Sequence, residues 1–190
     1  MDVIIYETAV FDSAQYLFMK KDALKKTKNI AITAMLVALY LVLAALLKVP
    51  VAGHITVDLG YVALMVACCN VGAVQSLIVG AMGAFLESAI MAQRGVSIGW
   101  ILMNAIVGYI CGMVLTKASK LETKKIIVRA VIVVPLSMAL GVVVKTFFDC
   151  IIYDLPVAVK IPTAIVACVL DSLVMLVFGL PLSLALRNRL

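Results

Sequence analysis

The chain has 190 residues, of which 65% are hydrophobic and 14% are charged, and its formal net charge is +6. Ordinary soluble domains have about a quarter of their residues charged, so this composition excludes that class and indicates a single membrane domain. The excess positive charge flanks apolar runs and does not mix with aromatic residues, so it favours a membrane-topology signal over nucleic-acid binding.

The chain is predicted to have two parts, an N-terminal cytoplasmic segment over residues 1–28 and a transmembrane domain over residues 29–190. Residues 1–18 lack the basic start and the long apolar core of a signal peptide. We interpret them as an extension or as the product of an upstream start. A lysine-rich stretch, 19–28, then leads into the first apolar run.

Three helices are predicted in the first half of the chain. A spanning helix needs about 20 apolar residues, and the run 29–47 meets this requirement. The next run, 57–91, would form a helix about 50 Å long, which is too long for one crossing. Its Asn70-Val71-Gly72 sequence predicts a break, giving a short helix over 57–69 and a longer one over 72–91.

Three more helices are predicted in the second half. The fourth covers 97–116, and the fifth covers 126–147, with Pro135 expected to bend it. Residues 149–161 are expected to connect it to a sixth helix, which Pro162 opens and which ends near Leu186. The sequence therefore predicts an all-α membrane protein, a bundle of six transmembrane helices.

Six crossings place both ends of the chain on one side of the membrane. Twelve Lys and Arg residues fall on that side: Lys20, Lys21, Lys25, Lys26, Lys28, Lys117, Lys120, Lys124, Lys125, Arg129, Arg187 and Arg189. Four fall on the other side: Lys48, Arg94, Lys145 and Lys160. Because cytoplasmic loops carry the excess of Lys and Arg, both termini are predicted to be cytoplasmic.

Small and polar residues recur at spacings of three and four in four of the predicted helices, which places them on one face of each. These faces comprise Gly72, Ser76, Gly80, Gly83 and Glu87; Trp100, Asn104, Gly108 and Gly112; Ser137, Gly141, Lys145 and Asp149; and Ala164, Ala167, Asp171 and Met175. Small residues let helices approach closely, and charges within a bilayer usually face protein or a cavity. All four faces are therefore predicted to point into the bundle.

The polar residues on these faces lie towards the outer side of the membrane. Asp171 is the deepest, about 13 Å below the start of its predicted helix. The others lie in outer-end turns: Glu87, Trp100, Asn104, Lys145 and Asp149. The inner halves hold almost nothing ionisable except Arg129. This arrangement suits the capture of a solute from outside, so we predict that these six residues bind substrate.

Several of these residues also have structural interpretations. Trp100 can be an aromatic-belt anchor at the membrane interface. Lys145 can extend to the membrane surface or pair with Asp149 four residues later. For Glu87 and Asp171, contact with a ligand or coupling ion is favoured over structural hydrogen bonding.

Polar residues in the predicted loops also have two interpretations. His54 and Asp58 either cap the loop before the second helix or line the mouth of the site. Gln93 and Arg94 are interpreted as solvated turn residues.

The sequence contains no catalytic or cofactor-binding motif. H-E-x-x-H, G-x-S-x-G and phosphate-binding loops are all missing, and a single histidine, His54, excludes a multi-histidine metal site. The five cysteines lack metal-binding spacing, and four of them lie inside apolar runs, where cysteine is predicted to behave as a small hydrophobic residue. We therefore expect no enzymatic activity, no cofactor and no metal.

Several segments resemble one family over roughly residues 19–190. They are the lysine-rich lead-in, the helix sequence Ile-Thr-Ala-Met-Leu-Val-Ala-Leu-Tyr at 32–40, Thr-Val-Asp-Leu-Gly-Tyr at 56–61, the glycine-rich helix through Glu87, and Gly99-Trp100 leading to Asn104 and Gly108. In this order they resemble the S components, or substrate-binding subunits, of energy-coupling factor (ECF) vitamin importers. The arrangement is most similar to the riboflavin-type branch.

The resemblance implies partners and a docking surface. The partners would be a transmembrane coupling subunit and two ATPase subunits in a bacterial plasma membrane, with a vitamin-like small molecule as substrate and no nucleic acid. In this family an Ala-x-x-x-Ala surface on the first helix docks the coupling subunit. Ala34 and Ala38 match it, with Ala31 on an adjacent part of the same face, and small residues at this spacing permit close helix packing.

The resemblance also places the substrate pocket at the outer ends of the last three helices, where Trp100, Asn104, Lys145, Asp149 and Asp171 fall. Aspartate at position 171 departs from the asparagine of some relatives, which leaves the ligand open. The acidic excess, Asp58, Glu87, Asp149 and Asp171 against Arg94 and Lys145, favours a cationic or donor-rich heterocycle. Trp100 and Tyr153 are candidates for stacking on such a ring, and a neutral flavin is also compatible.

Two rival functions stay open from the sequence alone, ahead of a third, a membrane enzyme, which would show turnover. One is a stand-alone proton-coupled secondary carrier with Glu87 or Asp171 as the proton site, although no inverted repeat is visible. The other is a non-transport structural membrane protein, for which Asp171 would matter only for stability.

Overall fold

The computed structural model describes residues 24, 26–46, 49–52, 55–91, 96–118, 122–154 and 157–187. The sequence predictions for residues 1–18, His54, Gln93 and Arg94 lie outside these residues. The chain divides into two compact units, 1–32 and 33–190. In the first unit the described residues are helical, and the second unit contains all the elements that follow the first helix.

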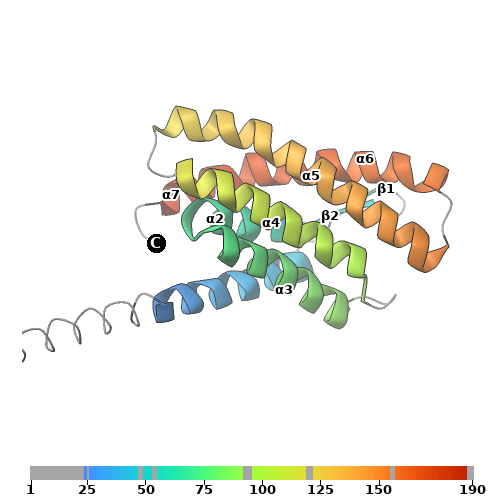
Figure 1. The fold of residues 1–190 in the computed structure, drawn as a ribbon, viewed down its shortest axis with the longest axis horizontal. Coiled ribbons are helices and arrows are strands. Elements are labelled where there is room, and N and C mark those ends of the chain that lie inside the picture. Colours follow the sequence, from blue (N-terminus) through green and yellow to red (C-terminus); the bar gives the residue numbers. More distant parts are fainter. Residues whose placement is uncertain are drawn as a thin grey trace, which may run out of the picture. The chain divides into compact units, whose positions relative to one another are not determined.

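The described elements are seven α-helices, one π-helical turn and a small sheet (Figure 1). They run in the order N-terminal helix Lys26–Leu46, β1 Val49–Ala52, β2 Ile55–Val57, α2 Gly60–Asn70, α3 Ala73–Met91, α4 Ile98–Ala118, α5 Thr123–Tyr153, α6 Val157–Val174, the π-helical turn η1 Met175–Gly179 and α7 Leu180–Leu186. The last three follow one another without a break and correspond to the predicted sixth helix.

The predicted helical bundle is confirmed in its class, with one addition. Strands β1 and β2 pair antiparallel, with Val49 opposite Val57, in a segment that was predicted as loop and helix start. Five of the described helices are long and apolar enough to cross a membrane, and α2 is a shorter apolar helix. At about 1.5 Å per residue its 11 residues are too short to span a hydrocarbon core of about 30 Å. The prediction of six spans is therefore confirmed only in part.

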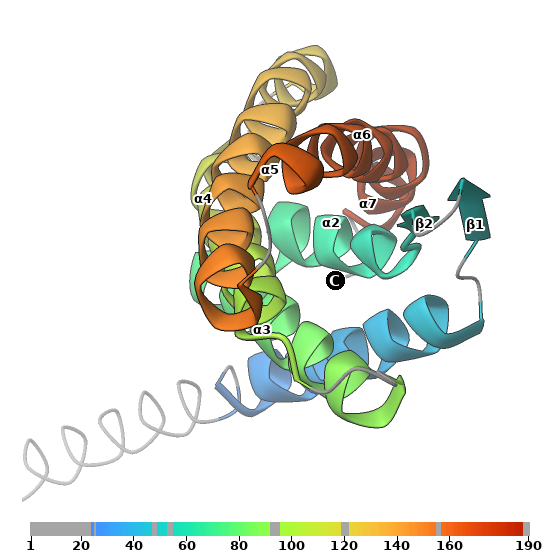
Figure 2. The same cartoon turned by 90° about the vertical axis from the view of Figure 1, so that its right-hand side faces the viewer.

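Helix α2 is the centre of the second unit (Figure 2). All residues in 60–69 are buried, and the helix packs against α3, α4, α6, η1 and α7. It begins where Asp58 Oδ1 accepts a hydrogen bond of 2.7 Å from the Gly60 amide. It ends where the Asn70 side chain donates to the carbonyl oxygens of Val66 and Ser183, at 3.1 and 3.2 Å.

The predicted break between the second and third helices is confirmed. Gly72 has a φ of +141°, a conformation that glycine adopts far more readily than other residues. The chain turns there and α3 begins at Ala73. The start of α2 is later than predicted, at Gly60 and not at residue 57, because residues 55–57 pair as β2.

Glycines bring α3 and α4 into close contact. A Cβ on Gly80 would collide with the backbone carbonyl of Asn104, and a Cβ on Gly108 would collide with that of Ser76. A Cβ on Gly112 would lie 2.8 Å from the Ala73 Cα atom. The predicted small-residue faces of these two helices therefore pack directly on each other, as expected for membrane helices.

Helix α5 is longer than predicted. It runs from Thr123 to Tyr153, so the predicted connection 149–161 is wrong for its first residues. The inward face of α5 continues through Ser137, Gly141 and Asp149, which are all buried, and the same periodicity carries the helix past residue 147. Asp154, with a φ of +49°, marks its end. Helix α6 likewise begins at Val157, so Pro162 lies inside it and does not open it.

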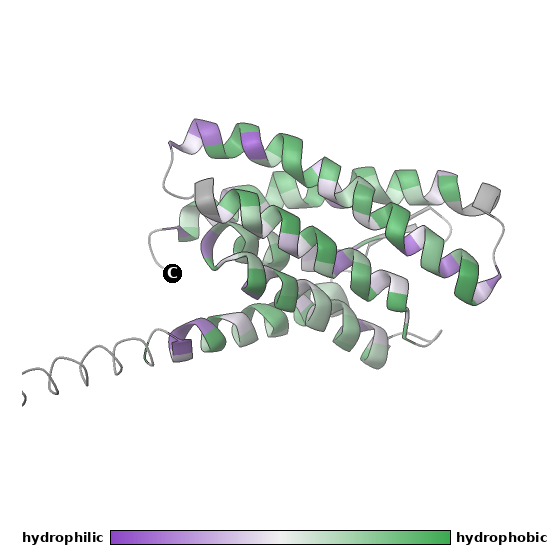
Figure 3. Cartoon of the chain, viewed as in Figure 1, coloured by the Kyte–Doolittle hydropathy of each residue, from purple (hydrophilic) through white to green (hydrophobic). Residues whose placement is uncertain are grey.

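The second unit has two ends, which differ in the elements that they hold and in the residues that gather there. The hairpin end holds the β1–β2 hairpin, the end of α3, the start of α4 and the end of α5; the basic end holds the start of α5 and the end of α7 (Figure 1). Hydrophobic residues cover most of the helix length, and hydrophilic ones gather at the start of α5 (Figure 3). Large apolar side chains such as Leu136, Val143 and Phe178 are exposed, as expected for a surface that faces lipid.

The close contact of α3 and α4 makes a testable prediction. Gly80→Ala and Gly108→Ala should each lower stability by about 1–3 kcal/mol, because the added methyl group meets backbone that cannot move aside easily. Thermal unfolding of the purified protein in detergent measures this. Ala89→Leu, at an exposed position on α3, is the matched control and should leave the unfolding midpoint unchanged. Unchanged midpoints in both glycine variants would contradict the packing.

Candidate functional site

A cluster of polar and aromatic residues lies towards the hairpin end of the second unit. We call it the polar cluster; its members are Tyr40, Asp58, Tyr61, Glu87, Trp100, Asn104, Lys145, Asp149 and Asp171. The four carboxylates are between 2% and 5% exposed. Their burial is notable because ionised side chains in a membrane protein usually have a partner or a function.

Trp100 connects three helices within the cluster. Its indole N–H donates a hydrogen bond of 3.2 Å to Glu87 Oε2, which joins α4 to α3. The Lys145 ammonium of α5 lies 4.7 Å from the centre of the indole ring, a favourable cation–π distance. Tyr61 of α2 meets the same ring edge to face, with centroids 6.2 Å apart and an interplanar angle of 77°.

Tyr40 joins the N-terminal helix to the cluster. Its side chain is fully buried, and its hydroxyl lies 3.3 Å from Asp58 Oδ2 and 3.4 Å from Asn104 Oδ1. Asn104 in turn donates a bond of 2.9 Å to the Trp100 carbonyl oxygen. These contacts link the segment before α2 to α4 through one phenol.

Asp171 and Tyr61 lie on facing elements of the cluster. The charges of Asp58, Lys145 and Glu87 all act on the Asp171 carboxyl, which also takes a hydrogen bond from the backbone of Asp58. Asp171 is 3% exposed and Tyr61 is fully buried. Within the described part of the chain, Asp171 Oδ1 and the Tyr61 hydroxyl make no hydrogen bond of standard geometry, although the Asn104 side chain lies near enough to interact with the Tyr61 hydroxyl.

Asp149 and Lys145 complete the cluster from the inward face of α5. Gly99 allows this face to approach the start of α4, because a Cβ there would lie 3.0 Å from the Lys145 carbonyl oxygen and 3.2 Å from Asp149 Oδ1. Because α5 continues to Tyr153, Asp149 lies on its inward face and is buried inside the bundle.

All six residues predicted from the sequence to bind substrate are therefore brought together. Glu87, Asn104, Asp149 and Asp171 are buried, and Trp100 and Lys145 are half-buried. The hydrogen bond from Trp100 to Glu87 and its contact with Lys145 are not those of a lipid-facing aromatic anchor. Because α6 begins at Val157, Asp171 lies about 21 Å from the helix start (14 residues at about 1.5 Å each), deeper than predicted.

The structure bears differently on two further sequence predictions, those for Asp58 and Tyr153. Asp58 Oδ1 accepts a hydrogen bond from the Gly60 amide at the start of α2, and Asp58 Oδ2 lies by the Tyr40 hydroxyl in the cluster. The first contact supports its structural role, and its place at the mouth of a site stays a prediction. Tyr153 is 44% exposed in the last turn of α5 and lies outside the polar cluster. Its predicted stacking role has no support in its position.

Sequence reasoning missed Tyr40 and Tyr61 as site residues. The available signal was a phenol within an otherwise apolar run, since a buried tyrosine hydroxyl usually requires a hydrogen-bond partner. Both residues appear in segments used for the family resemblance, but no pattern of spacing connected them with Asp58 or Asp171.

Below the cluster the core is mostly apolar, and its buried serines Ser76, Ser137 and Ser183 donate to backbone carbonyl oxygens of their own helices or turns. Buried residues towards the basic end include Val107, Leu115, Ala130, Val134 and Met138. The predicted role of the cysteines as small hydrophobic residues agrees with their state: all five are free, and Cys68, Cys69 and Cys111 are buried. Among the described residues no group of side chains could hold a metal ion.

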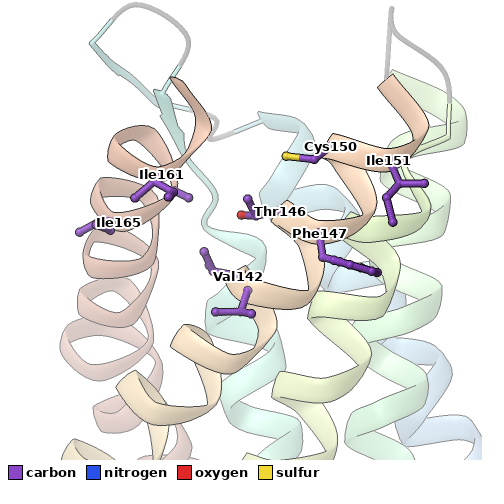
Figure 4. Close-up of a pocket in the computed structure, with 9 residues that line it drawn as sticks. Val142, Thr146, Phe147, Cys150, Ile151, Ile161 and Ile165 are labelled. Atoms are coloured by element: carbon purple, nitrogen blue, oxygen red, sulfur yellow. The ribbon is translucent and has the colours of Figure 1, made fainter. Parts of the chain in front are cut away.

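A separate groove of about 550 Å³ lies between α5 and α6 (Figure 4). Its lining is apolar apart from Thr146 and includes Val142, Phe147, Ile161 and Ile165. Phe147 and Ile165 are also exposed on the outer surface of the helices. Because binding sites for polar small molecules need a few orienting polar groups, this groove is a poorer candidate than the polar cluster.

The hydrogen bonds of Tyr40 predict a stability effect. Tyr40→Phe removes the one O–H that can donate to either Asp58 Oδ2 or Asn104 Oδ1, which should cost about 1–3 kcal/mol. The thermal unfolding midpoint in detergent measures it. Tyr109→Phe, at a position that is 39% exposed on α4, is the control and should have no effect. Equal midpoints for the two variants would contradict the structural role of the Tyr40 hydroxyl.

Comparison with known families agrees with this architecture. The family model of the ECF-type riboflavin transporter S component matches residues 24–188, which includes every member of the polar cluster. No curated protein and no solved structure matches the chain. Since the match extends over most of the 190 residues, the chain belongs to the ECF-type riboflavin transporter S component family.

Proposed function

We propose that this protein captures a vitamin or a related small heterocycle outside a bacterial cell and delivers it to an ATP-driven ECF complex. The observation that carries the proposal is the burial of four carboxylates beside Trp100 and Lys145 at one end of an otherwise apolar bundle. Membrane proteins retain such costly groups mainly where they bind or move polar solutes.

Charge distribution supports an outward-facing site. Lys124, Lys125 and Arg187 lie at the basic end of the second unit, opposite the polar cluster. Over the sequence, twelve Lys and Arg residues fall on the side of the predicted cytoplasmic termini and four on the other. The positive-inside rule then places the basic end in the cytoplasm and the polar cluster towards the exterior.

Dependence on other subunits follows from what the sequence lacks. No phosphate-binding loop is present in the 190 residues, so ATP hydrolysis is assigned to two separate ATPase subunits. A transmembrane coupling subunit would join them to this chain. Membership of the S component family supports this division of labour.

The N-terminal helix carries the surface proposed for the coupling subunit. Ala31, Ala34 and Ala38 are all exposed, whereas Thr33, Leu36 and Tyr40 are buried on the other side of the same helix. Exposed small residues at helical spacing allow the backbone of a second membrane helix to approach closely.

This surface predicts a separation of binding from transport. Ala34→Leu and Ala38→Leu should abolish co-purification with the coupling subunit and ATP-dependent uptake, because a bulky side chain holds the partner helix away. Affinity for the substrate should be unchanged. Ala89→Leu is the matched control and should retain assembly. Normal assembly of both Ala34→Leu and Ala38→Leu would contradict the proposed interface.

The proposed function predicts that the purified protein retains a small molecule. Mass spectrometry of the compound released on denaturation should identify a vitamin or heterocycle. The Trp100→Ala protein should not retain the compound, because Glu87, Lys145 and Tyr61 all contact this ring and would lose their common neighbour. The Ala89→Leu protein is the control and should retain the compound. Uptake of the compound by proteoliposomes should require the coupling and ATPase subunits. Uptake by this chain alone under a pH gradient would instead establish a secondary carrier.

A further inference from the structure

The apolar groove between α5 and α6 is separate from the polar cluster. It shares no lining residue with that cluster, and its volume is about 550 Å³. Among the described residues that line it, none is charged and Thr146 supplies the one hydroxyl. Because a water molecule in a cavity needs about two to four polar partners, water is a poor filling for this groove.

The groove opens on the outer surface of the bundle. Five of its lining residues are exposed there: Val143, Phe147, Ile151, Ile161 and Ile165. This is the kind of surface that an apolar spanning helix presents to lipid. The groove is therefore continuous with the hydrocarbon of the membrane, and a lipid chain reaches it without crossing a polar layer.

The length of the groove matches one leaflet of a bilayer. On α5 its lining runs from Val142 to Ile151, which is about 14 Å at about 1.5 Å per residue. Half of a hydrocarbon core of about 30 Å is about 15 Å. The last residue of α5 is Tyr153, directly after this stretch, and tyrosine is enriched at the membrane interface. A chain that enters at this interface therefore extends to the middle of the bilayer along the groove.

The width of the groove excludes a protein helix. A volume of about 550 Å³ over about 14 Å gives a mean cross-section of about 40 Å². An α-helix with its side chains is about 10 Å across, which is a cross-section of about 80 Å². The groove therefore suits a single extended chain better than a helix from a second copy or from another subunit.

Three half-buried side chains of α5 line the inner part of the groove. Val142, Thr146 and Cys150 recur at intervals of four and so lie on one face of the helix. Figure 4 shows the Cys150 sulfur on the side of α5 that faces α6. Without an occupant these side chains would forfeit van der Waals contacts on one side. Since water is a poor filling, an apolar occupant is needed to supply those contacts.

We propose that one acyl chain of a membrane phospholipid lies in this groove, inserted from the leaflet at the hairpin end. Lipid tails are as apolar as the lining, so the preference for this position comes from van der Waals packing against fixed walls. The phospholipid is therefore held more firmly than those on the rest of the surface, and it supports the packing of α5 on α6. This binding does not depend on the solute that the polar cluster holds.

Filling the groove tests the proposal. Ala164 is a half-buried lining residue, so Ala164→Phe places a ring where the chain would lie. The full-length protein is purified in a bile-salt detergent, whose rigid rings are unlike an acyl chain. Native mass spectrometry then detects the phospholipid that stays bound. The unsubstituted protein should retain a phospholipid, and Ala164→Phe should not.

Ala139→Phe is the matched control, because Ala139 is exposed on α5 and does not line the groove. It should keep the phospholipid. Removal of phospholipid should lower the thermal unfolding midpoint of the unsubstituted protein and of Ala139→Phe. The midpoint of Ala164→Phe should not change, because its ring supplies the contacts of the chain. Equal retention by both variants, or an equal fall in midpoint for all three proteins, would overturn the proposal.

Alkylation of Cys150 gives a second measurement that needs no bulky substitution. Cys150 is a free thiol in the groove, and Cys168→Ala removes the other half-buried cysteine, since Cys68, Cys69 and Cys111 are buried. Phosphatidylglycerol or phosphatidylcholine is added to the lipid-free protein. At about ten times its Kd, either phospholipid should slow the reaction of Cys150 with N-ethylmaleimide by about 10-fold.

The control for this measurement is Ile152→Cys in a protein that lacks Cys150 and Cys168. Ile152 lies at nearly the same depth on α5 and is exposed outside the groove, so phospholipid should slow its alkylation much less. Equal protection at both positions would show general coverage by lipid and overturn the proposal. Protection of Cys150 by the coupling subunit and not by phospholipid would assign the groove to a protein partner and would also overturn it.

Discussion

The cost of removing charged groups from water governs this structure. An ionised carboxylate in a membrane bundle is strongly unfavourable unless neighbouring donors or charges compensate it. The chain meets this constraint by gathering its buried carboxylates near the start of α2, where a backbone amide, a phenol, an indole and an ammonium are available to them. The rest of the core is then free to be apolar, and the outer surface of the helices can face lipid.

Packing at the centre of the bundle makes this gathering possible. Helix α2 is too short to cross a membrane but is buried along its length, so it acts as a core around which the longer helices pack. The glycine contacts between α3 and α4 bring these two helices close enough for the Trp100 indole to reach Glu87. Fold and site therefore depend on the same contacts, and the loss of one glycine contact should affect both.

Helical periodicity predicted much of this arrangement from the sequence. The faces that contain Glu87, Asn104, Asp149 and Asp171 are buried. Their burial was predictable because small and polar residues recur on each face every three or four positions. The β1–β2 hairpin and the true end of α5 were not predictable in the same way. Short strands have little pattern. Asp149 was predicted on the inward face of the fifth helix and also as the first residue of the connection 149–161, so the end of α5 at Tyr153 was not anticipated. Tyr40 and Tyr61 were missed because their partners are distant in sequence.

The central claim is that the polar cluster, and not the apolar groove between α5 and α6, holds the solute. An experimental structure of the purified protein with its bound compound tests this most directly. If the polar cluster holds the solute, density for the compound will lie against the Trp100 ring and in contact with the buried carboxylates of the cluster. Density for the compound confined to the groove lined by Phe147 and Ile165, with the polar cluster closed around its own side chains, would contradict it.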